Sequence, residues 1–186
     1  LESDEGPLAT GQTHYREELL GQKFRIASPS FFQVNTRQAE QLVLMVRDRL
    51  KLTGIETLVD AYAGVGTFAV LLARHVKHVI AIEESEAAVK DAAINALGVE
   101  NLEFRQGKTE EVMGDLDGKA EVIVLDPPRV GCQPGALDAV VQLAPRRLCY
   151  VSCDPESLAR DLQTLVDGGL RVDRIEPIDM FPQTHH

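Results

Sequence analysis

From residue 57 onward the chain alternates short apolar runs with amphipathic stretches, and this alternation is the strongest constraint on its fold. The apolar runs predict strands at residues 57–63, 78–84, 102–107, 120–128 and 146–153. The helical periodicity between and after them predicts helices at residues 66–76, 85–98, 134–144 and 156–169. Strands that are apolar nearly throughout, separated by such helices, are typical of a parallel sheet covered on both faces. The sequence therefore predicts a doubly wound α/β fold.

The segments that flank this alternation predict an extension at each end. Residues 1–13 are polar and contain Gly and Pro, which indicates a linker remnant in front of a single domain at residues 14–186. A weak alternation around Gly21 predicts a hairpin, and residues 36–50 follow a helical period with Thr36 as the expected N-cap. Residues 170–181 are expected to form a last strand.

Composition excludes several classes of protein. Of the 186 residues 44% are apolar, but no run approaches the ~18 apolar residues of a membrane span, and no signal peptide is recognisable. The three cysteines are odd in number and lack C-x-x-C spacing, which argues against a zinc site and a disulfide framework and for a reducing, cytoplasmic location. The net charge of −10 argues against a self-sufficient nucleic-acid binder, because phosphate contacts need clustered Lys and Arg.

The first two strand ends suggest a nucleoside cofactor. Ligands of such sheets bind beyond the carboxyl ends of the strands. Gly64 and Gly66 follow the first strand and allow close approach of a ligand, although glycines for a tight turn explain them as well. Glu83 and Glu84 follow the second strand, where a carboxylate can accept hydrogen bonds from ribose hydroxyls or cap the next helix. Together they favour adenosine recognition, by NAD or by S-adenosylmethionine.

Two further strand ends carry residues with chemical potential. Asp126 is followed by two prolines, which stiffen the exit and present its side chain at the sheet edge, or make it the cap of a rigid turn. Cys153 directly precedes Asp154 and Pro155, a good N-cap and a good first helical residue. A helix N-terminus lowers a thiol pKa, so Cys153 is either a nucleophile, partly exposed, or an inert thiol. Cys149 is expected to be structural and Cys132 passive.

Taken in their order along the chain, these strand-end motifs resemble those of the catalytic domain of the RNA uridine-5 methyltransferases, which make 5-methyluridine in tRNA and ribosomal RNA. The resemblance covers residues 14–186 and implies a Rossmann-like class I methyltransferase fold that uses S-adenosylmethionine. The stretches that carry it are SFFQVN (30–35), DAYAGVGTF (60–68), IEES (82–85), LDPPR (125–129), YVSCDPES (150–157) and FPQTHH (181–186).

The resemblance implies a role for individual residues. The residues expected to bind S-adenosylmethionine are Gln33, Tyr62, Gly64, Thr67 (where many relatives have Asn), Glu83 and Asp126. Asp126 should also lie next to the uracil, and Cys153 should be the nucleophile that adds to carbon 6 of the base. Relatives continue two residues beyond the FPQTHH motif to a glutamate base and then to a further strand beside the strand at 146–153. His185 and His186 are not expected to replace that base.

The resemblance also implies an RNA-binding region upstream of residue 14, since many relatives carry a small β-barrel and a cysteine-rich iron–sulfur segment there. We therefore expect this chain to bind cofactor and to bind RNA weakly. Two alternatives remain open. An amino-group nucleic-acid methyltransferase would share the acidic-Pro-Pro stretch, but usually follows it with an aromatic residue where Arg129 stands. These enzymes also need no cysteine nucleophile. The absence of the glutamate base and the acidic composition favour the other alternative, a cofactor- or RNA-binding module without activity. The sequence does not distinguish tRNA from ribosomal RNA as substrate.

Overall fold

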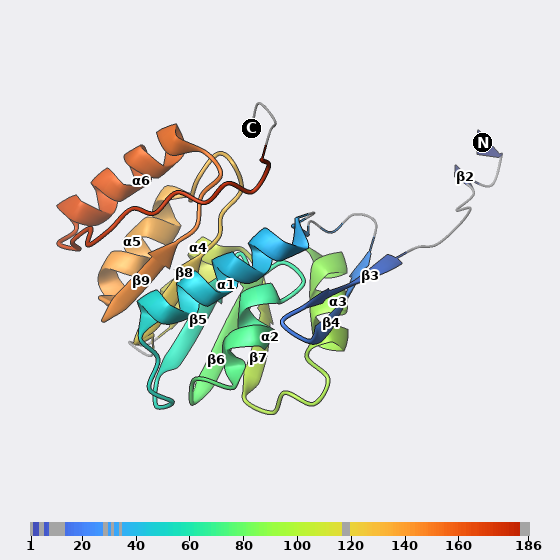
Figure 1. Cartoon of the computed structure of the whole chain (residues 1–186). Helices are drawn as coiled ribbons and strands as arrows, with labels where there is room; N and C mark the ends of the chain where they lie inside the picture. Colours follow the sequence, from blue (N-terminus) through green and yellow to red (C-terminus); the bar gives the residue numbers. More distant parts are fainter. Residues whose placement is uncertain are drawn as a thin grey trace.

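A five-stranded parallel sheet forms the centre of the computed structural model, which describes residues 2–3, 6–7, 14–27, 30, 32–33, 35–116 and 120–182 (Figure 1). The strand order is β7-β6-β5-β8-β9, and all four neighbouring pairs are parallel. The strands are β5 (Thr57–Ala61), β6 (His78–Glu83), β7 (Leu102–Gln106), β8 (Val122–Leu125) and β9 (Arg147–Tyr150). The chain enters this sheet at its central strand, β5, runs outward through β6 to β7, and then crosses back to β8 and β9. The five predicted strands and the doubly wound fold are therefore confirmed.

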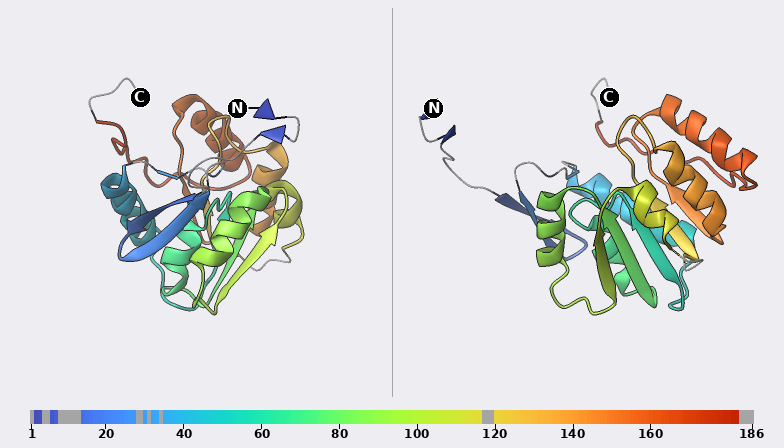
Figure 2. Two further views of the ribbon diagram at one scale, coloured as in Figure 1. Left: turned by 90° about the vertical axis from the view of Figure 1, so that its right-hand side faces the viewer. Right: turned by 180° about the vertical axis from the view of Figure 1, so that it is seen from behind.

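Helices cover both faces of this sheet (Figure 2). They are α1 (Thr36–Leu50), α2 (Thr67–Ala73), α3 (Glu86–Asn95), α4 (Thr109–Gly114), α5 (Pro134–Leu143) and α6 (Pro155–Asp167). One face carries α1, α2 and α3, and the other carries α4, α5 and α6, as right-handed crossovers require. The sequence did not predict α4, because six residues are too few to show a helical period. None of the helices in the described part of the chain is long and apolar enough to cross a membrane.

Each strand of the centre is buried on both sides. In β5, Leu58 faces the α1–α2 side while Val59 and Ala61 face the α4–α5 side, and all three are fully buried. In β8, Val124 and Leu125 divide between the two faces in the same way. This two-sided burial is the reason that the strands are continuous apolar runs rather than alternating ones.

The predicted hairpin precedes the sheet. Strands β3 (His14–Leu19) and β4 (Gln22–Ala27) are antiparallel, and their turn residues Leu20 and Gly21 both have positive φ, 49° and 80°. That conformation matches the twist of a two-residue hairpin. Phe24 is fully buried in the same cluster as the apolar residues of α1, so the hairpin extends the core beyond the sheet. Upstream, the two-residue strands β1 (Glu2–Ser3) and β2 (Gly6–Pro7) pair with each other, and the remainder of the predicted linker lies outside the described residues.

Helix α3 attaches the hairpin to the loop after β5. The side chain of Asn95 accepts a hydrogen bond from Arg25 N (2.7 Å) and donates to Arg25 O and Val65 O (3.0 Å each). Asp91, fully buried one turn earlier, pairs with the Arg25 guanidinium. Two side chains of one helix therefore fix β4 relative to the glycine loop, although these segments lie far apart in the sequence.

The predicted last strand at residues 170–181 is wrong. Residues 171–179 carry no strand hydrogen bonds and are largely exposed. A strand needs a hydrogen-bonded neighbour, and the outer edge of β9 pairs with no described strand. The segment instead runs beside α1, where Arg49 makes two 2.7 Å hydrogen bonds to Glu176.

The predicted N-cap of α1 is also wrong by one residue. Asn35, and not Thr36, caps the helix, with its Oδ1 accepting from Gln38 N at 3.2 Å. Its amide nitrogen donates to Met180 O at 3.0 Å, so one side chain serves both the helix and the C-terminal segment. Asn and Thr are both good caps, and only the backbone path before the helix decides between them.

Candidate active site

The residues singled out by the sequence meet at the carboxyl edge of the sheet. Glu83 ends β6, the glycine loop follows β5, Asp126 follows β8, and Cys153 lies between β9 and α6. Adjacent strands are about 4.8 Å apart, so the four ends extend along roughly 14 Å of this edge. Asp126 and Cys153 follow neighbouring strands, one step apart.

The glycine loop is held by a carboxylate from the next strand. Gly64 N donates to Glu83 Oε2 (2.8 Å), and Ser85 N donates to Glu83 Oε1 (2.7 Å). These bonds orient the Glu83 carboxylate and leave lone pairs on both oxygens for further donors. Gly64 has φ 56°, and a Cβ placed on it would meet nothing within 4 Å, so space is open above the loop. A Cβ on Gly66 would instead contact Phe104 at 3.4 Å, which assigns that glycine to helix packing.

Asp60, which the sequence reading passed over, lies beneath this loop. It is fully buried, its Oδ2 accepts from Ala69 N at 2.8 Å, and its Oδ1 has no hydrogen-bond partner among the described residues. Burial raises the pKa of Asp60 to about 8, and the nearby Asp126 and Glu83 carboxylates add to this rise. An unpaired buried carboxyl oxygen is costly, which points to a hydrogen-bonding group supplied by a ligand. The sequence feature that could have identified Asp60 as a site residue is its position at the start of DAYAGVG, directly before the glycine loop.

The other expected cofactor residues lie around the loop. Thr67 is the first residue of α2 and is half-buried. Gln33 is half-buried in the connection between the hairpin and α1. Tyr62 has a positive φ of 64°, and its ring packs on the α4–α5 side of the sheet. Its buried hydroxyl has no hydrogen-bond partner of normal geometry among the residues that the structure describes. Burial raises the pKa of Tyr62, and the adjacent Cys132 contributes to this shift.

Asp126 leaves β8 with its amide donating to Ala61 O at 3.3 Å and its side chain half-buried. Desolvation raises the pKa of Asp126 to about 7. Near neutral pH this carboxyl is thus balanced between its protonated and ionised forms, and a cation nearby would favour ionisation.

Cys153 is exposed, as expected for a nucleophile, whereas Cys149 is half-buried in β9 and Cys132 is buried. Asp154 caps α6 by accepting from Ser157 N at 2.8 Å, and Pro155 occupies the first turn, so both of these predictions are confirmed. The thiol therefore lies just before the N-terminus of α6, a helix of 13 residues. In the described part of the chain no three His, Cys, Asp or Glu side chains are grouped like metal ligands. His185 and His186 lie outside the described residues.

These features fit an adenosine cofactor: an open glycine loop, a fixed carboxylate at the next strand, and an unpaired buried carboxyl oxygen below them. Fold and site together define the class of Rossmann-like proteins that bind a nucleoside cofactor at the switch point between β5 and β8. A family model described as tRNA (uracil-5-)-methyltransferase matches residues 16–186, and the chain belongs to that family.

Individual relatives agree with this assignment. The chain is 47% identical to an uncharacterized RNA methyltransferase of Thermosynechococcus vestitus, a match covering 98% of the chain and 41% of the relative. It is 44% identical to one of Gloeobacter violaceus, with 95% and 38% covered. The chain thus spans about 40% of the length of these curated relatives.

Solved structures show the same similarity. The Pyrococcus abyssi tRNA (uracil-54, C5)-methyltransferase, crystallised with S-adenosyl-L-homocysteine, superposes with a TM-score of 0.79 and 35% identity over 93% of this chain and 42% of that one. Trm5b from the same organism superposes with a TM-score of 0.63 at 17% identity, covering 87% of this chain and 48% of that one, which shows the common fold alone.

Proposed function

We propose that the protein transfers a methyl group from S-adenosylmethionine to carbon 5 of a uridine in tRNA or ribosomal RNA, in the cytoplasm, through a covalent adduct with Cys153. The observation that carries the proposal is an exposed thiol at a helix N-terminus, one strand away from Asp126 and on the same sheet edge as the adenosine-type loop. Family membership and the cofactor product in the Pyrococcus structure support it.

In this proposal the cofactor extends along the carboxyl edge. Glu83 accepts the ribose hydroxyls with the lone pairs left by Gly64 and Ser85, and Gly64 leaves room for the nucleoside. Gln33, Tyr62 and Thr67 contact the same molecule. Two strand steps further, about 10 Å, Asp126 faces its methionine end. The sulfonium supplies an electrophilic methyl group, and its positive charge favours the ionised form of Asp126.

The role of Cys153 follows from the chemistry of uracil. Carbon 5 becomes nucleophilic only after the Cys153 sulfur has bonded to carbon 6 and the electron pair of the ring double bond has moved toward carbon 5 and the carbonyl. Carbon 5 then takes the methyl group as the bond from that group to the sulfonium sulfur breaks, which would leave a neutral thioether. A base removes the proton that remains on carbon 5, and the re-formed double bond expels the thiolate. The target base must leave its stack to reach the sheet edge, which an exposed thiol permits.

We attribute most of the RNA affinity to protein outside residues 1–186. The charge of −10 opposes binding to phosphates, and the chain spans only about 40% of its curated relatives. We expect a gel-shift assay to show weaker binding of transcript by this chain than by the full-length protein. Equal affinity would refute this attribution.

The test of the proposed function is adduct formation with RNA containing 5-fluorouridine. The carbon–fluorine bond blocks the final proton removal, so incubation with S-adenosylmethionine should leave a complex that survives denaturing electrophoresis. We expect the adduct to disappear in Cys153→Ala and to persist in Cys149→Ala, a matched removal of a half-buried thiol on β9. An adduct in Cys153→Ala would refute the assignment of the nucleophile. No adduct, together with methylated purines in natural RNA, would indicate an amino-group methyltransferase.

A further inference from the structure

Three side chains of α6 hold the loop that follows Asp126. Ser157 Oγ donates to Arg129 O (3.0 Å), Arg160 Nη2 donates to Val130 O (2.7 Å), and Asp161 Oδ2 accepts from Cys132 N (2.7 Å). These bonds attach helix and loop at three points within four residues of the loop.

The sheet does not supply this attachment. In the described part of the chain, the last backbone hydrogen bond between β8 and β9 runs from Val151 N to Leu125 O at 2.7 Å. Beyond it, Asp126 and Cys153 continue into separate loops. Their relative position at the sheet edge therefore depends on contacts between the two loops and the helix that follows.

Asp161 is the centre of these contacts. It is fully buried, and besides Cys132 N it accepts from Tyr150 Oη (2.6 Å) and from Arg160 Nε and Nη2 (2.9 and 2.7 Å). A buried carboxylate is tolerated only when its lone pairs are satisfied in this way. One side chain thus joins β9, the loop and α6.

Gly131 shows independently how closely the loop approaches the helix. It has φ 83°, and a Cβ built on it would overlap the guanidinium of Arg160 and the carboxylate of Asp161. A side chain at this position would push the loop away from α6 as well as strain the backbone. A side chain here would therefore disturb the contact of the loop with Arg160 and Asp161.

We propose that Asp161, supported by Arg160, is a positioning residue for methyl transfer. Helix α6 begins at Pro155, two residues after Cys153, so the element that carries the thiol at its N-terminus also fixes the loop that carries Asp126. Asp161 touches neither substrate nor cofactor and acts through the geometry of these two groups. This inference rests on the proposed function.

A matched control at the opposite edge of the sheet distinguishes a positioning role of Asp161 from a purely structural one. Glu56 is also a buried carboxylate, 2% exposed, that accepts backbone hydrogen bonds and pairs with one arginine, Arg146. Glu56→Gln removes a charge from an equivalent environment far from the strand ends that carry the site. It should lower thermal stability without changing the rate per folded molecule.

The experiment compares Asp161→Asn and Glu56→Gln with wild type in the full-length protein. It measures the rate constant of adduct formation with 5-fluorouridine RNA at saturating S-adenosylmethionine, and the Kd for S-adenosylhomocysteine. We expect Asp161→Asn to lower the rate constant roughly 10- to 100-fold, the range that small misplacements of reacting groups cause. The Kd of Asp161→Asn for S-adenosylhomocysteine should stay within about twofold of wild type. Glu83, on the ribose side of the site, follows β6, which lies two strands from β8 and the loop that Asp161 holds. Arg160→Met keeps the unbranched apolar part of a side chain that is 60% exposed, so this variant should fold and show the same change in the rate constant.

A rate constant within about threefold of wild type in both Asp161→Asn and Arg160→Met would overturn the inference, and so would an equal loss in Glu56→Gln. If wild type forms no adduct, the proposed function fails, and amide hydrogen exchange at residues 129–133 then decides the positioning role. Faster exchange there in Arg160→Met, with unchanged exchange in Glu56→Gln, supports it. Unchanged exchange in both overturns it.

Discussion

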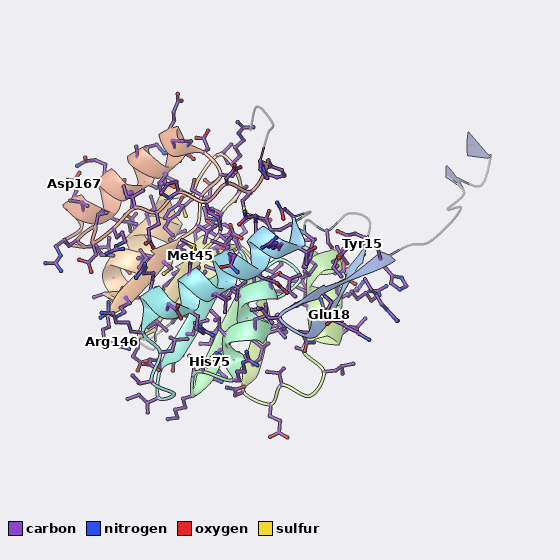
Figure 3. All side chains as sticks on the ribbon, viewed as in Figure 1. Tyr15, Glu18, Met45, His75, Arg146 and Asp167 are labelled. Atoms are coloured by element: carbon purple, nitrogen blue, oxygen red, sulfur yellow. The ribbon has the colours of Figure 1, made fainter. Side chains whose placement is uncertain are left out.

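Glu56 is the buried carboxylate whose removal we expect to destabilise the fold most clearly. It accepts hydrogen bonds from Thr53 N and Oγ1, from Gly54 N and Ile55 N, and from Arg146 Nη2 at 2.7 Å. Arg146, labelled in Figure 3, approaches it from the start of β9. The carboxylate thereby closes the turn before β5 and joins this turn to the residue that precedes the edge strand β9.

The magnitude follows from these bonds. Glu56→Gln keeps one acceptor oxygen but loses the charge-assisted bond to Arg146 and turns an NH₂ group toward backbone donors. Hydrogen bonds to a charged group are worth about 1.5–3 kcal/mol, so we expect a loss of about 2–3 kcal/mol in the free energy of unfolding. For 186 residues the unfolding entropy is about 0.4 kcal/mol/K, which corresponds to a Tm lower by roughly 5–8 °C.

The loss should depend on pH in a defined direction. Burial by itself raises the pKa of Glu56, but the hydrogen bonds from Thr53 and its neighbours outweigh burial and lower it to about 2. Because the folded pKa lies below the ordinary value of 4.5, the stabilisation is complete above about pH 4.5 and is lost as the pH falls toward 2. The stability gap between wild type and Glu56→Gln should therefore narrow over this interval.

The assay is thermal and urea unfolding of both proteins at pH 7, 4 and 3. Glu121→Gln is the matched control, because Glu121 accepts from Thr57 N (2.7 Å) at the same edge but is exposed, and it should change stability by less than about 0.5 kcal/mol. A loss below about 0.5 kcal/mol in Glu56→Gln, or a gap that stays constant from pH 7 to pH 3, would refute the reasoning.

Two further predictions concern the site and its surroundings. Asp60 has a folded pKa of about 8, above its ordinary 3.8, so wild type should lose stability as the pH rises from about 4 to 8. Asp60→Asn should remove that loss and show its largest gain in Tm over wild type at pH 8, and a gain that does not grow between pH 5 and pH 8 would contradict the assignment. Asn35→Asp keeps the acceptor for Gln38 N but cannot donate to Met180 O. We expect faster amide exchange at residues 176–182 with protection of α1 unchanged, and equal exchange in both proteins would show that this hydrogen bond does not hold the segment.

Much of the fold was predictable because the sequence carries it locally. The apolar runs at β5, β6 and β8 are buried on both faces, and amphipathic periods mark α1 and α6. The parallel order of the strands then places the residues after them at one edge. For this reason the position of Cys153 at that edge could be predicted without coordinates, and the local sequence Asp-Pro predicted the cap at Asp154.

The failures have a common physical cause. The strand expected at residues 170–181 needs a hydrogen-bonded neighbour, which no local pattern reveals. The cap of α1 depended on the path of the backbone before it, which placed Asn35 and not Thr36 at the helix end. The burial of Asp60 could not be predicted from the sequence, because a charged residue beside a glycine loop is as compatible with exposure as with burial.

The sequence by itself determined the sheet, its helices and the edge at which the chemistry-bearing residues gather, because periodicity and strand-end chemistry are properties of neighbouring residues. Only the tertiary structure decided how that edge and the opposite edge of the sheet are held. Asp161 bonds to Cys132 across 29 positions, and Arg146 bonds to Glu56 across 90. Such pairs form because folding brings distant segments within about 3 Å, and nothing in the spacing of residues along the chain specifies which of its many carboxylates will be buried with a partner.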